Sequence, residues 1–562
     1  AERLSWLTGF TGSAGIALVM RDKAIVFVDG RYVTQLAEQV DGAVFTGGDL
    51  VGEPPHLWLR NHGLKSFRLG IDPWLHTGAE VRRLEKTLAE LGGQLVFLPY
   101  NPLDRAWTDR PAEPLGRVVI QDIDHAGELA RDKLVTMADA TAKAGADVLA
   151  VTDPSSIAWI FNIRGSDVPH TPHPLARAII PAEGRPQLFL DKRKTGIEPE
   201  AYLTQLADLL PPSQFDEQVA KLAAAGKRIL IDPDQAPFAL AEIVRSKGGT
   251  LVEAADPARL PRACKNAVEL QGSARAHLQD GAAMVEFLAW LDSTPPGSQT
   301  EISVTKRLEE VRRTLGERHQ NPLKDVSFDT IAGAGAHAAI MHYRVTTESD
   351  TAIEAGTMFL IDSGAQYVNG TTDITRTVAI GDVPEEQKRF FTLVLKGMIA
   401  ISLARFPKGT RGCDLDPLAR IALWKAGADF AHGTGHGVGS YLSVHEGPQR
   451  ISRLSTQELL PGMILSNEPG YYRPGAFGIR IENLVHVLPA AAVEGGDIDM
   501  LGFETLTFCP IDRRLVLAHL MTDEELDWLN AYHAETREKI APLLTDDATK
   551  AWLEKATAPI RR

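Results

Sequence analysis

The chain of 562 residues carries a formal net charge of −14, with 44% hydrophobic and 23% charged residues. A chain of this length exceeds what one hydrophobic core usually organises, so we expect three domains. The composition is ordinary for a soluble protein, the acidic balance disfavours nucleic acid and anionic membranes as partners, and no apolar run approaches the roughly 18 residues that span a bilayer.

The first half of the sequence contains a faint internal repeat. Residues 6–13 read WLTGFTGS and residues 159–166 read WIFNIRGS. Each segment precedes a strand-like run that ends in aspartate, at Asp29 and at Asp191. Chance similarity is the alternative reading, and we expect a duplicated α/β unit.

Two proline-bearing stretches suggest domain boundaries. The first follows Trp107 in the sequence WTDRPAEP, and the second spans residues 256–262. The predicted domains are therefore residues 1–112, 113–261 and 262–562.

The three cysteines, Cys264, Cys413 and Cys509, are odd in number and far apart. They have no metal-binding or redox spacing and are typical of reduced thiols in a cytoplasmic protein. The sequence begins at Ala1, almost inside a strand-like motif. We expect that a start segment is missing, so any targeting signal in it lies outside the sequence.

The third domain opens with a helical pattern. Apolar residues recur at intervals of four, three and four, with charged residues between them, at Val304, Leu308, Val311 and Leu315. Residues 387–406 and 417–428 also predict helices, and Pro407 and Gly409 end the first of these two.

Two aspartates follow this region in strand-like surroundings. Asp362 ends the apolar run MFLI, which indicates a buried strand, and Asp373 precedes the β-branched run ITRTV. Between them, Asn369-Gly370 is the strongest short hairpin signal. A hairpin at this point would bring the two aspartates back towards each other.

A pair of glutamates has a similar setting. Glu468 follows the run GMILSN, and Glu482 ends the predicted strand IRIE after a loop. Alternation along this strand places Ile479 and Ile481 on one face and Arg480 and Glu482 on the other. Arg480 would then point towards the glutamates, where its guanidinium could orient a ligating carboxylate.

A glycine-rich histidine segment lies between the two acidic pairs. Residues 432–439 read HGTGHGVG, with His432 and His436 four residues apart. That spacing resembles a helical zinc-peptidase motif, but each glycine in a helix costs about 1 kcal/mol relative to alanine. We therefore expect a loop or strand in which His436 is a metal ligand and His432 is not.

These five residues offer one imidazole nitrogen and four carboxylates. Buried carboxylates without partners are costly, so we interpret the set as a site for two divalent metal ions. The hard donors favour Mn²⁺, with Co²⁺ or Zn²⁺ as substitutes. Two such ions about 3.5–4 Å apart, bridged by carboxylates and a hydroxide, form a hydrolytic centre.

Each residue taken alone has an ordinary explanation. An aspartate after an apolar run is commonly a strand-end cap, and a glutamate before Pro-Gly is commonly a solvated turn residue. A single histidine is commonly packed in a core. The combination of two acid-bearing strand pairs around the histidine segment favours the metal site.

The sequence resembles a known family at these positions. The segments IDSGAQYVNGTTDITRT, HGTGHGVGSYLSVHEGP, NEPGYY and GIRIEN closely resemble the catalytic domain of aminopeptidase P, an Xaa-Pro aminopeptidase of the pita-bread metallopeptidase superfamily. The likeness continues in SFDTIAGAGAHAAIMHY and, in the N-terminal half, in FTGSAG, DGRY, WTDRP and IAWIFNIRGSD. It implies two creatinase-like α/β domains followed by a pita-bread catalytic domain of α+β type, and a homodimer.

The resemblance also implies a role for each metal ligand. Asp362 would chelate one ion, His436 and Glu468 would bind the other, and Asp373 and Glu482 would bridge the two. Glu468 would in addition be the general base that activates the attacking water.

Three histidines and a tyrosine complete the implied site. His445 would steady the scissile carbonyl as negative charge develops on it, while His342 and His432 would line the substrate cleft and help to move protons. For these histidines, a purely structural place in the cleft is the alternative. Tyr472, His342 and His445 are candidate walls of an apolar pocket for proline.

The implied reaction is removal of the residue before proline from peptides that carry proline at the second position. Prolidase, which cleaves Xaa-Pro dipeptides and shares the metal ligands, is the main alternative. Methionine aminopeptidase lacks two preceding domains of this size. A non-catalytic peptide-binding protein and a metal-free creatinase-like enzyme are disfavoured, because all five ligand positions are kept.

Overall fold

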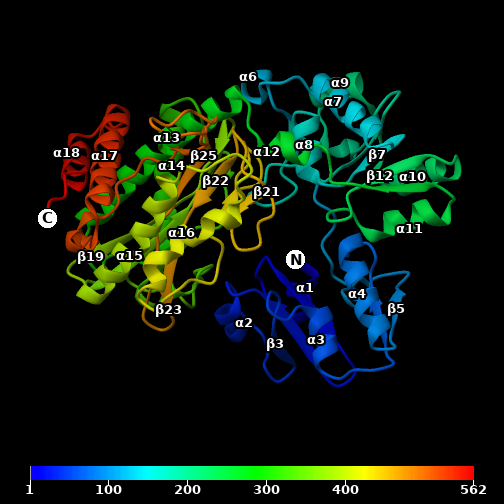
Figure 1. Cartoon of the computed structure of the whole chain (residues 1–562), viewed down its shortest axis with the longest axis horizontal. Coiled ribbons are helices and arrows are strands. Elements are labelled where there is room, and N and C mark those ends of the chain that lie inside the picture. The colour runs from blue at the N-terminus through cyan, green and yellow to red at the C-terminus, as the bar shows by residue number, and fades with distance from the viewer. Residues whose placement is uncertain (1) are drawn as a thin grey trace. The chain divides into compact units, whose positions relative to one another are not determined.

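The computed structural model describes residues 2–562 and divides them into two compact units. One unit comprises the chain up to residue 123 together with residues 128–168 and 173–259, and the other comprises residues 124–127, 169–172 and 260–562. Figure 1 shows the chain coloured from the N-terminus to the C-terminus. The predicted boundary at residue 112 falls inside the first unit and stays a prediction.

The first unit contains short strands that alternate with helices. Its strands are β1 Gly15–Val19, β2 Ala24–Val28, β3 Phe45–Asp49, β4 Arg68–Ile71, β5 Gln94–Phe97, β6 Val119–Ile120, β7 Val148–Val151, β8 Ile163–Arg164, β9 Arg177–Pro181, β10 Gln187–Phe189, β11 Asp208–Leu210, β12 Arg228–Ile231 and β13 Thr250–Glu253. Its helices are α1 Glu2–Thr8, α2 Val33–Gln39, α3 Pro55–Asn61, α4 Gly78–Glu90, α5 Pro102–Ala106, α7 Ala130–Lys143, α8 Pro154–Ile160, α9 Ile197–Leu206, α10 Phe215–Ala224 and α11 Phe238–Ser246.

The sequence repeat corresponds to a repeated arrangement of strands within this unit. β2 pairs with β1 antiparallel and with β3 parallel, and β10 pairs with β9 antiparallel and with β11 parallel. In both copies the residue three positions after the repeated tryptophan, Gly9 or Asn162, has a positive φ. The duplicated α/β unit that the sequence predicts is therefore confirmed.

The second unit holds antiparallel sheets and long helices. Its strands are β14 Asp325–Val326, β15 Ile331–Ala334, β16 Thr357–Ser363, β17 Ala365–Tyr367, β18 Gly370–Thr371, β19 Ile374–Ile380, β20 Gly435–Gly437, β21 Glu446–Ile451, β22 Ile464–Asn467, β23 Gly470–Arg473, β24 Phe477–Arg480, β25 Asn483–Val487 and β26 Phe503–Thr505. Its helices are α12 Arg259–Ala263, α13 Ala267–Ser293, α14 Glu301–Arg318, α15 Glu385–Ser402, α16 Gly412–Trp424, α17 Asp523–Ile540 and α18 Asp547–Ala556, and α6 Ile123–Ala126 adjoins it.

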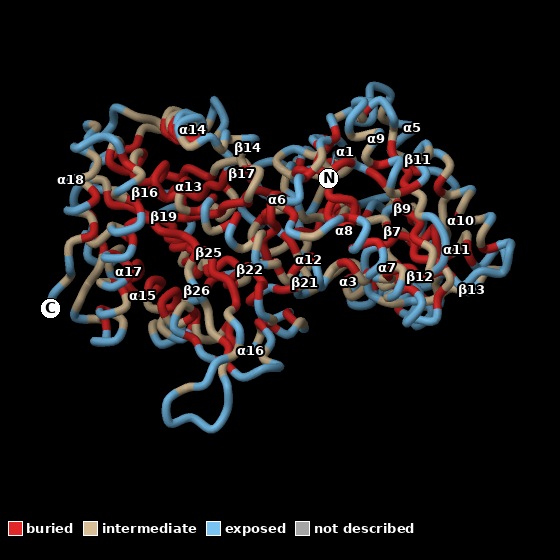
Figure 2. Tube along the Cα trace, turned by 90° about the horizontal axis from the view of Figure 1, so that it is seen from above, coloured by how far each residue is buried: buried red, intermediate tan, exposed pale blue. Residues whose placement is uncertain are grey.

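Two antiparallel sheets form the centre of this unit, in the orders β15-β16-β19 and β21-β20-β22-β25-β26. The buried segments follow β16, β19, β22 and β25 in Figure 2. Side chains of α15, α16 and α17 share one hydrophobic core with these strands. The strands that carry or adjoin the candidate ligands are therefore packed against one hydrophobic core.

Helix α14 matches the helical pattern that the sequence predicts. Val304, Leu308, Val311 and Leu315 are buried on one face, and Thr300 begins the helix with a capping box. No helix among residues 2–562 is long and apolar enough to cross a membrane.

The predicted ends of the next two helices were wrong. α15 ends at Ser402 rather than at 406, because Phe406 instead exchanges backbone hydrogen bonds with Leu501. α16 begins at Gly412, with Pro417 inside it rather than at its start, and ends at Trp424.

Candidate metal centre

The two aspartates lie at the same end of the β16–β19 pair. Asp362 is in β16 opposite Thr375 of β19, and Asp373 immediately precedes β19. The connecting hairpin folds where the sequence predicts it, but Tyr367 pairs with Gly370. The turn is therefore Val368-Asn369, one residue earlier than the Asn-Gly dipeptide suggested.

The two glutamates flank the β22–β25 pair in the same way. Glu468 follows β22 and Glu482 precedes β25, and the neighbouring residues Asn467 and Asn483 face each other in the ladder. Ile479 and Ile481 are fully buried in the main core. The predicted strand ends at Arg480, so Glu482 lies between β24 and β25 rather than inside a strand.

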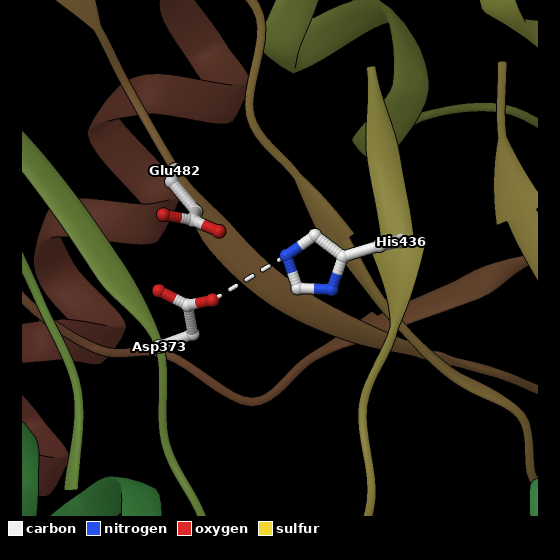
Figure 3. Close-up of side chains that lie close together, drawn as sticks. All are labelled: Asp373, His436 and Glu482. Carbon is white, nitrogen blue, oxygen red and sulfur yellow. Dashed lines mark ion pairs between the residues drawn. The ribbon is translucent and has the colours of Figure 1, made fainter. Parts of the chain in front are cut away.

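Histidine and carboxylates converge between these two strand pairs. Ligand atoms of Asp373, His436 and Glu482 lie within 4.8 Å of one another (Figure 3). His436 Nε2 is 3.5 Å from Asp373 Oδ2 and 3.5 Å from Glu468 Oε1. His436 Nδ1 lies 3.0 Å from the carbonyl oxygen of Gly437, which as an acceptor fixes the proton on Nδ1 and leaves the Nε2 lone pair towards the carboxylates.

In the carboxylates of Asp362 and Glu482, one oxygen is held by a protein hydrogen bond and the other is open. Arg480 Nη2 donates to Asp362 Oδ2 at 2.6 Å, and Thr375 Oγ1 donates to Glu482 Oε2 at 2.7 Å. The other oxygens, Asp362 Oδ1 and Glu482 Oε1, are buried without a hydrogen-bond partner, and so is Asp373 Oδ1. Since buried polar atoms are rarely left unsatisfied, these oxygens fit a metal-binding role.

The electrostatics of the site favour cations. Burial and then the charges of Asp362 and Glu468 raise the pKa of Asp373 well above its usual range. Burial and then the charge of Asp373 raise the pKa of Glu482 well above its usual range, and burial raises the pKa of Glu468. Four carboxylates this close are costly to ionise together unless positive charge is placed among them.

A chain of hydrogen bonds leads away from Asp362. Arg480 Nη1 donates to Tyr472 Oη at 2.7 Å, and Tyr472 Oη is 2.9 Å from His432 Nε2. His432 Nδ1 lies 2.7 Å from the Gly433 carbonyl, so in the neutral ring Nδ1 carries the proton and Nε2 accepts. Burial raises the pKa of Tyr472 to about 12, so its hydroxyl keeps its proton at neutral pH and donates it to His432.

The remaining two histidines lie beside these groups. The ring of His445, an exposed residue, is 4.3 Å from the ring of His436 in an edge-on arrangement. His342 is partly buried and follows Met341, whose carbonyl accepts a hydrogen bond from Arg480 at 3.3 Å. The structure therefore places all the candidate residues in one region of the second unit, while their chemical roles stay predictions.

Sequence reasoning missed the hydroxyl groups of the site. Thr375 Oγ1 contacts both Glu482 and Arg480, and Thr377 exchanges hydrogen bonds with the backbone of Arg480. Ser466 Oγ donates to Glu468 Oε1 at 3.1 Å. The signal was available in the alternation along β19, which puts Thr375 and Thr377 on the same face as Asp373.

Family models match nearly the whole chain. Residues 272–489 match metallopeptidase family M24, residues 499–560 match the C-terminal region of peptidase M24, and residues 1–98 and 109–269 each match a creatinase/prolidase N-terminal domain.

Similar proteins carry concordant names. Aminopeptidase P2 of Arabidopsis thaliana is 39% identical, over 100% of this chain and 83% of its own length. A probable Xaa-Pro aminopeptidase P of Ajellomyces capsulatus is 37% identical, over 99% and 93%.

Two solved structures are similar to the chain to different degrees. The crystal structure of X-prolyl aminopeptidase from Caenorhabditis elegans, described as a cytosolic enzyme with a di-nuclear active site, is 34% identical with a TM-score of 0.93, over 99% of this chain and 92% of that chain. An Xaa-Pro dipeptidase from Bacillus anthracis has a TM-score of 0.54 and 25% identity, over 68% of this chain and 99% of that one.

Proposed function

The chain belongs to the Xaa-Pro aminopeptidase P group of metallopeptidase family M24, and we propose that it removes the first residue from peptides whose second residue is proline. The observation that carries the proposal is the convergence of His436 and the carboxylates, with open buried oxygens, in a chain that resembles such enzymes over its full length. The site is built for two divalent metal ions, for which we propose Mn²⁺ because the donors are hard.

We assign the ligands as the family resemblance implies. Asp362 would hold one ion, His436 and Glu468 would hold the other, and Asp373 and Glu482 would contribute to both. When bound, the ions polarise the scissile carbonyl and lower the pKa of water to near neutrality.

The protein's own groups then handle the proton and the peptide. Glu468 would accept the proton of the attacking water and pass it to the proline nitrogen as the C–N bond breaks, and Ser466 holds its Oε1 in place for that purpose. His445 donates a hydrogen bond to the carbonyl oxygen as it gains negative charge. His342 and His432 line the cleft, and the hydrogen bonds that run from Asp362 through Arg480 and Tyr472 to His432 fix the orientation of the His432 ring.

Proline defines the substrate through its covalent structure. An Xaa-Pro bond is a tertiary amide without an N–H, and the ring fixes φ. A peptidase that grips this N–H cannot bind such a bond productively. We propose that Tyr472, His342 and His445 form the walls that accept the ring, and that the acidic metal site receives the free α-amino group.

The cellular location and the oligomeric state are proposed from the cysteines, one similar enzyme and the family resemblance. All three cysteines are free thiols, and the similar enzyme of Caenorhabditis elegans is described as cytosolic. We therefore propose a cytoplasmic enzyme. A homodimer is proposed from the family resemblance alone.

A three-substrate assay tests the proposal. Protein stripped with EDTA and reloaded with Mn²⁺, Co²⁺ or Zn²⁺ is incubated with an Xaa-Pro-Pro tripeptide, an Xaa-Pro dipeptide and a Met-Ala peptide. We expect cleavage of the tripeptide with Mn²⁺ and no activity after stripping. Preference for the dipeptide would establish a prolidase instead, and metal binding without any cleavage would indicate a peptide-binding protein.

A further inference from the structure

A buried ion pair joins two helices behind the candidate metal centre. Arg312 of α14 donates from Nε and Nη2 to the two carboxylate oxygens of Asp280 of α13, at 2.8 and 2.9 Å. Both residues are inaccessible to solvent, with exposed fractions of 0% and 2%. Neither residue belongs to the group of candidate ligands, and the sequence patterns gave no reason to single them out.

The arginine side of the pair holds the chain just after Asp362. Arg312 Nη2 donates to Ser363 Oγ at 3.1 Å, and Nη1 donates to the carbonyl of Gly364 at 3.4 Å. A Cβ at Gly364 would collide with the carbonyl oxygen of Thr372. The two arms of the hairpin therefore approach each other closely at the point that the guanidinium contacts.

The aspartate side of the pair holds the chain just before Asp373. Thr372 Oγ1 donates to Asp280 Oδ2 at 3.0 Å, and Tyr367 Oη donates to Asp280 Oδ1 at 3.0 Å. Thr372 Oγ1 also accepts from the backbone N–H of Ala365 at 3.0 Å. One ion pair thus contacts the immediate neighbours of both aspartates.

The stability that this ion pair contributes does not explain its presence, whereas its effect on the position of the chain does. A buried ion pair contributes little net stability compared with well-packed apolar side chains, because both charges must be desolvated. The pair has no net charge, so it adds none to the candidate metal site. What remains is the fixed position that its hydrogen bonds impose on the chain between the two aspartates.

We propose that Asp280 and Arg312 are positioning residues that set the spacing of Asp362 and Asp373 for metal binding. The proposal rests on the metal site of the proposed function, but its readout is metal affinity rather than turnover. Supporting groups around ligands commonly change metal affinity by about 10-fold to 100-fold.

The test uses two double variants of the full chain. R312M/D280N removes the ion pair, whereas S363A/T372V keeps the pair and removes hydroxyls that it contacts on the hairpin. Each metal-free protein is titrated with MnCl₂ by calorimetry, and its thermal unfolding is followed in parallel. We expect folded proteins whose Mn²⁺ affinity is weaker by about 10-fold to 100-fold.

The matched control is a buried ion pair in the other unit, Lys194–Asp167, at 2.7 Å with side-chain exposures of 6% and 0%. K194M/D167N is expected to change the unfolding temperature and to leave Mn²⁺ affinity within twofold. If R312M/D280N does not fold, S363A/T372V decides the question.

The proposal is overturned if every folded protein among R312M/D280N and S363A/T372V binds Mn²⁺ with wild-type affinity. It is also overturned if the control K194M/D167N loses Mn²⁺ affinity to the same extent. Wild-type protein that binds two Mn²⁺ without cleaving any peptide overturns the proposed function but not this inference. Wild-type protein that binds no Mn²⁺ overturns both.

Discussion

Replacing Glu468 by glutamine separates its two proposed roles from a purely structural one. Glutamine keeps an oxygen that can accept the hydrogen bond of Ser466 Oγ at 3.1 Å, but it loses the charge and the basicity. Burial raises the pKa of Glu468 in the metal-free protein. The ionised carboxylate therefore destabilises the folded state at neutral pH, and the neutral amide removes this cost.

The two expected effects have opposite signs. The metal-free variant should unfold at a higher temperature than the metal-free wild type. Its turnover at saturating Mn²⁺ should fall by about 10²-fold to 10⁴-fold, which is the usual contribution of a general base. At about 1.36 kcal/mol per tenfold, the barrier rises by roughly 3 to 5 kcal/mol.

The assay measures kcat on an Xaa-Pro-Pro tripeptide, with the bound metal determined in the same sample. Asp216→Asn is the matched control, because burial also raises the pKa of this carboxyl and it lies in the other unit. The control should keep full turnover. Near-normal turnover of the Glu468 variant with full metal content would refute the role as base.

Three further predictions test the surroundings of the site. Tyr472→Phe breaks the hydrogen bonds to Arg480 and His432. Because the loss of one or two such bonds costs about 1–3 kcal/mol, kcat/KM should fall about 10-fold to 100-fold. The Mn²⁺ affinity measured by calorimetry should not change. Gly364→Ala places a Cβ against the opposite arm of the hairpin, so Mn²⁺ binding should be lost; wild-type affinity would contradict the close approach. Burial lowers the pKa of His533 to about 3, so the stability that its neutral ring contributes is complete above the unfolded pKa of about 6.5 and is lost as the pH falls towards 3. Between pH 8 and pH 5 the free energy of unfolding should therefore fall by about 2 kcal/mol. Denaturant titrations of His533→Gln should lack this fall.

The sequence predicted elements whose local residue pattern is strong. The apolar stripe of α14, the unbroken apolar run in β16 and the β-branched residues of β19 made the existence and type of these elements evident. Helix α13, 27 residues long, was missed because buried residues occupy all of its faces, as the unbroken buried run of residues 279–285 shows. A helix buried nearly all round lacks the one-sided stripe on which periodicity depends.

The turn between Asp362 and Asp373 shows a second limit of prediction from sequence. Asn369-Gly370 has the composition of a two-residue turn, but tertiary packing shifts it by one residue. A Cβ at Gly272 of α13 would meet the carbonyl oxygen of Asn369 at 2.5 Å, and Gly370 lies against Ser273. Contacts with a helix about 100 residues earlier in the chain therefore decide the turn, and no local pattern could reveal them.

The residues of the candidate site also fall into those that the sequence pattern revealed and those that it could not reveal. The ligand candidates were recognisable because carboxylates in apolar strands are unusual, and alternation also indicated that Arg480 would face them. Asp280 and Arg312 could not be recognised, since an isolated charged residue on a helix is ordinarily solvated. Their burial becomes apparent only when α13 and α14 are packed against the hairpin.

The charge balance of the site leads to one more prediction. Among the side chains that the structure describes, one guanidinium, that of Arg480, forms an ion pair with the four carboxylates of the site, and it does so through Asp362. The three remaining negative charges exceed what one divalent ion neutralises, so two ions fit the site better than one. In the metal-free protein, burial and mutual repulsion raise the pKa of Asp373 and of Glu482 well above the usual range.

We therefore expect protons to occupy part of the site when metal is absent, and binding of Mn²⁺ to release them. Calorimetric titrations at one neutral pH, in two buffers with different ionisation enthalpies, measure this release directly. The apparent binding enthalpy should differ between the buffers by the number of protons released times the difference in ionisation enthalpy, and the affinity should weaken as the pH falls. Equal enthalpies in both buffers would mean that the carboxylates are already ionised, and that the protein stabilises their charge in some way other than by protons or metal ions.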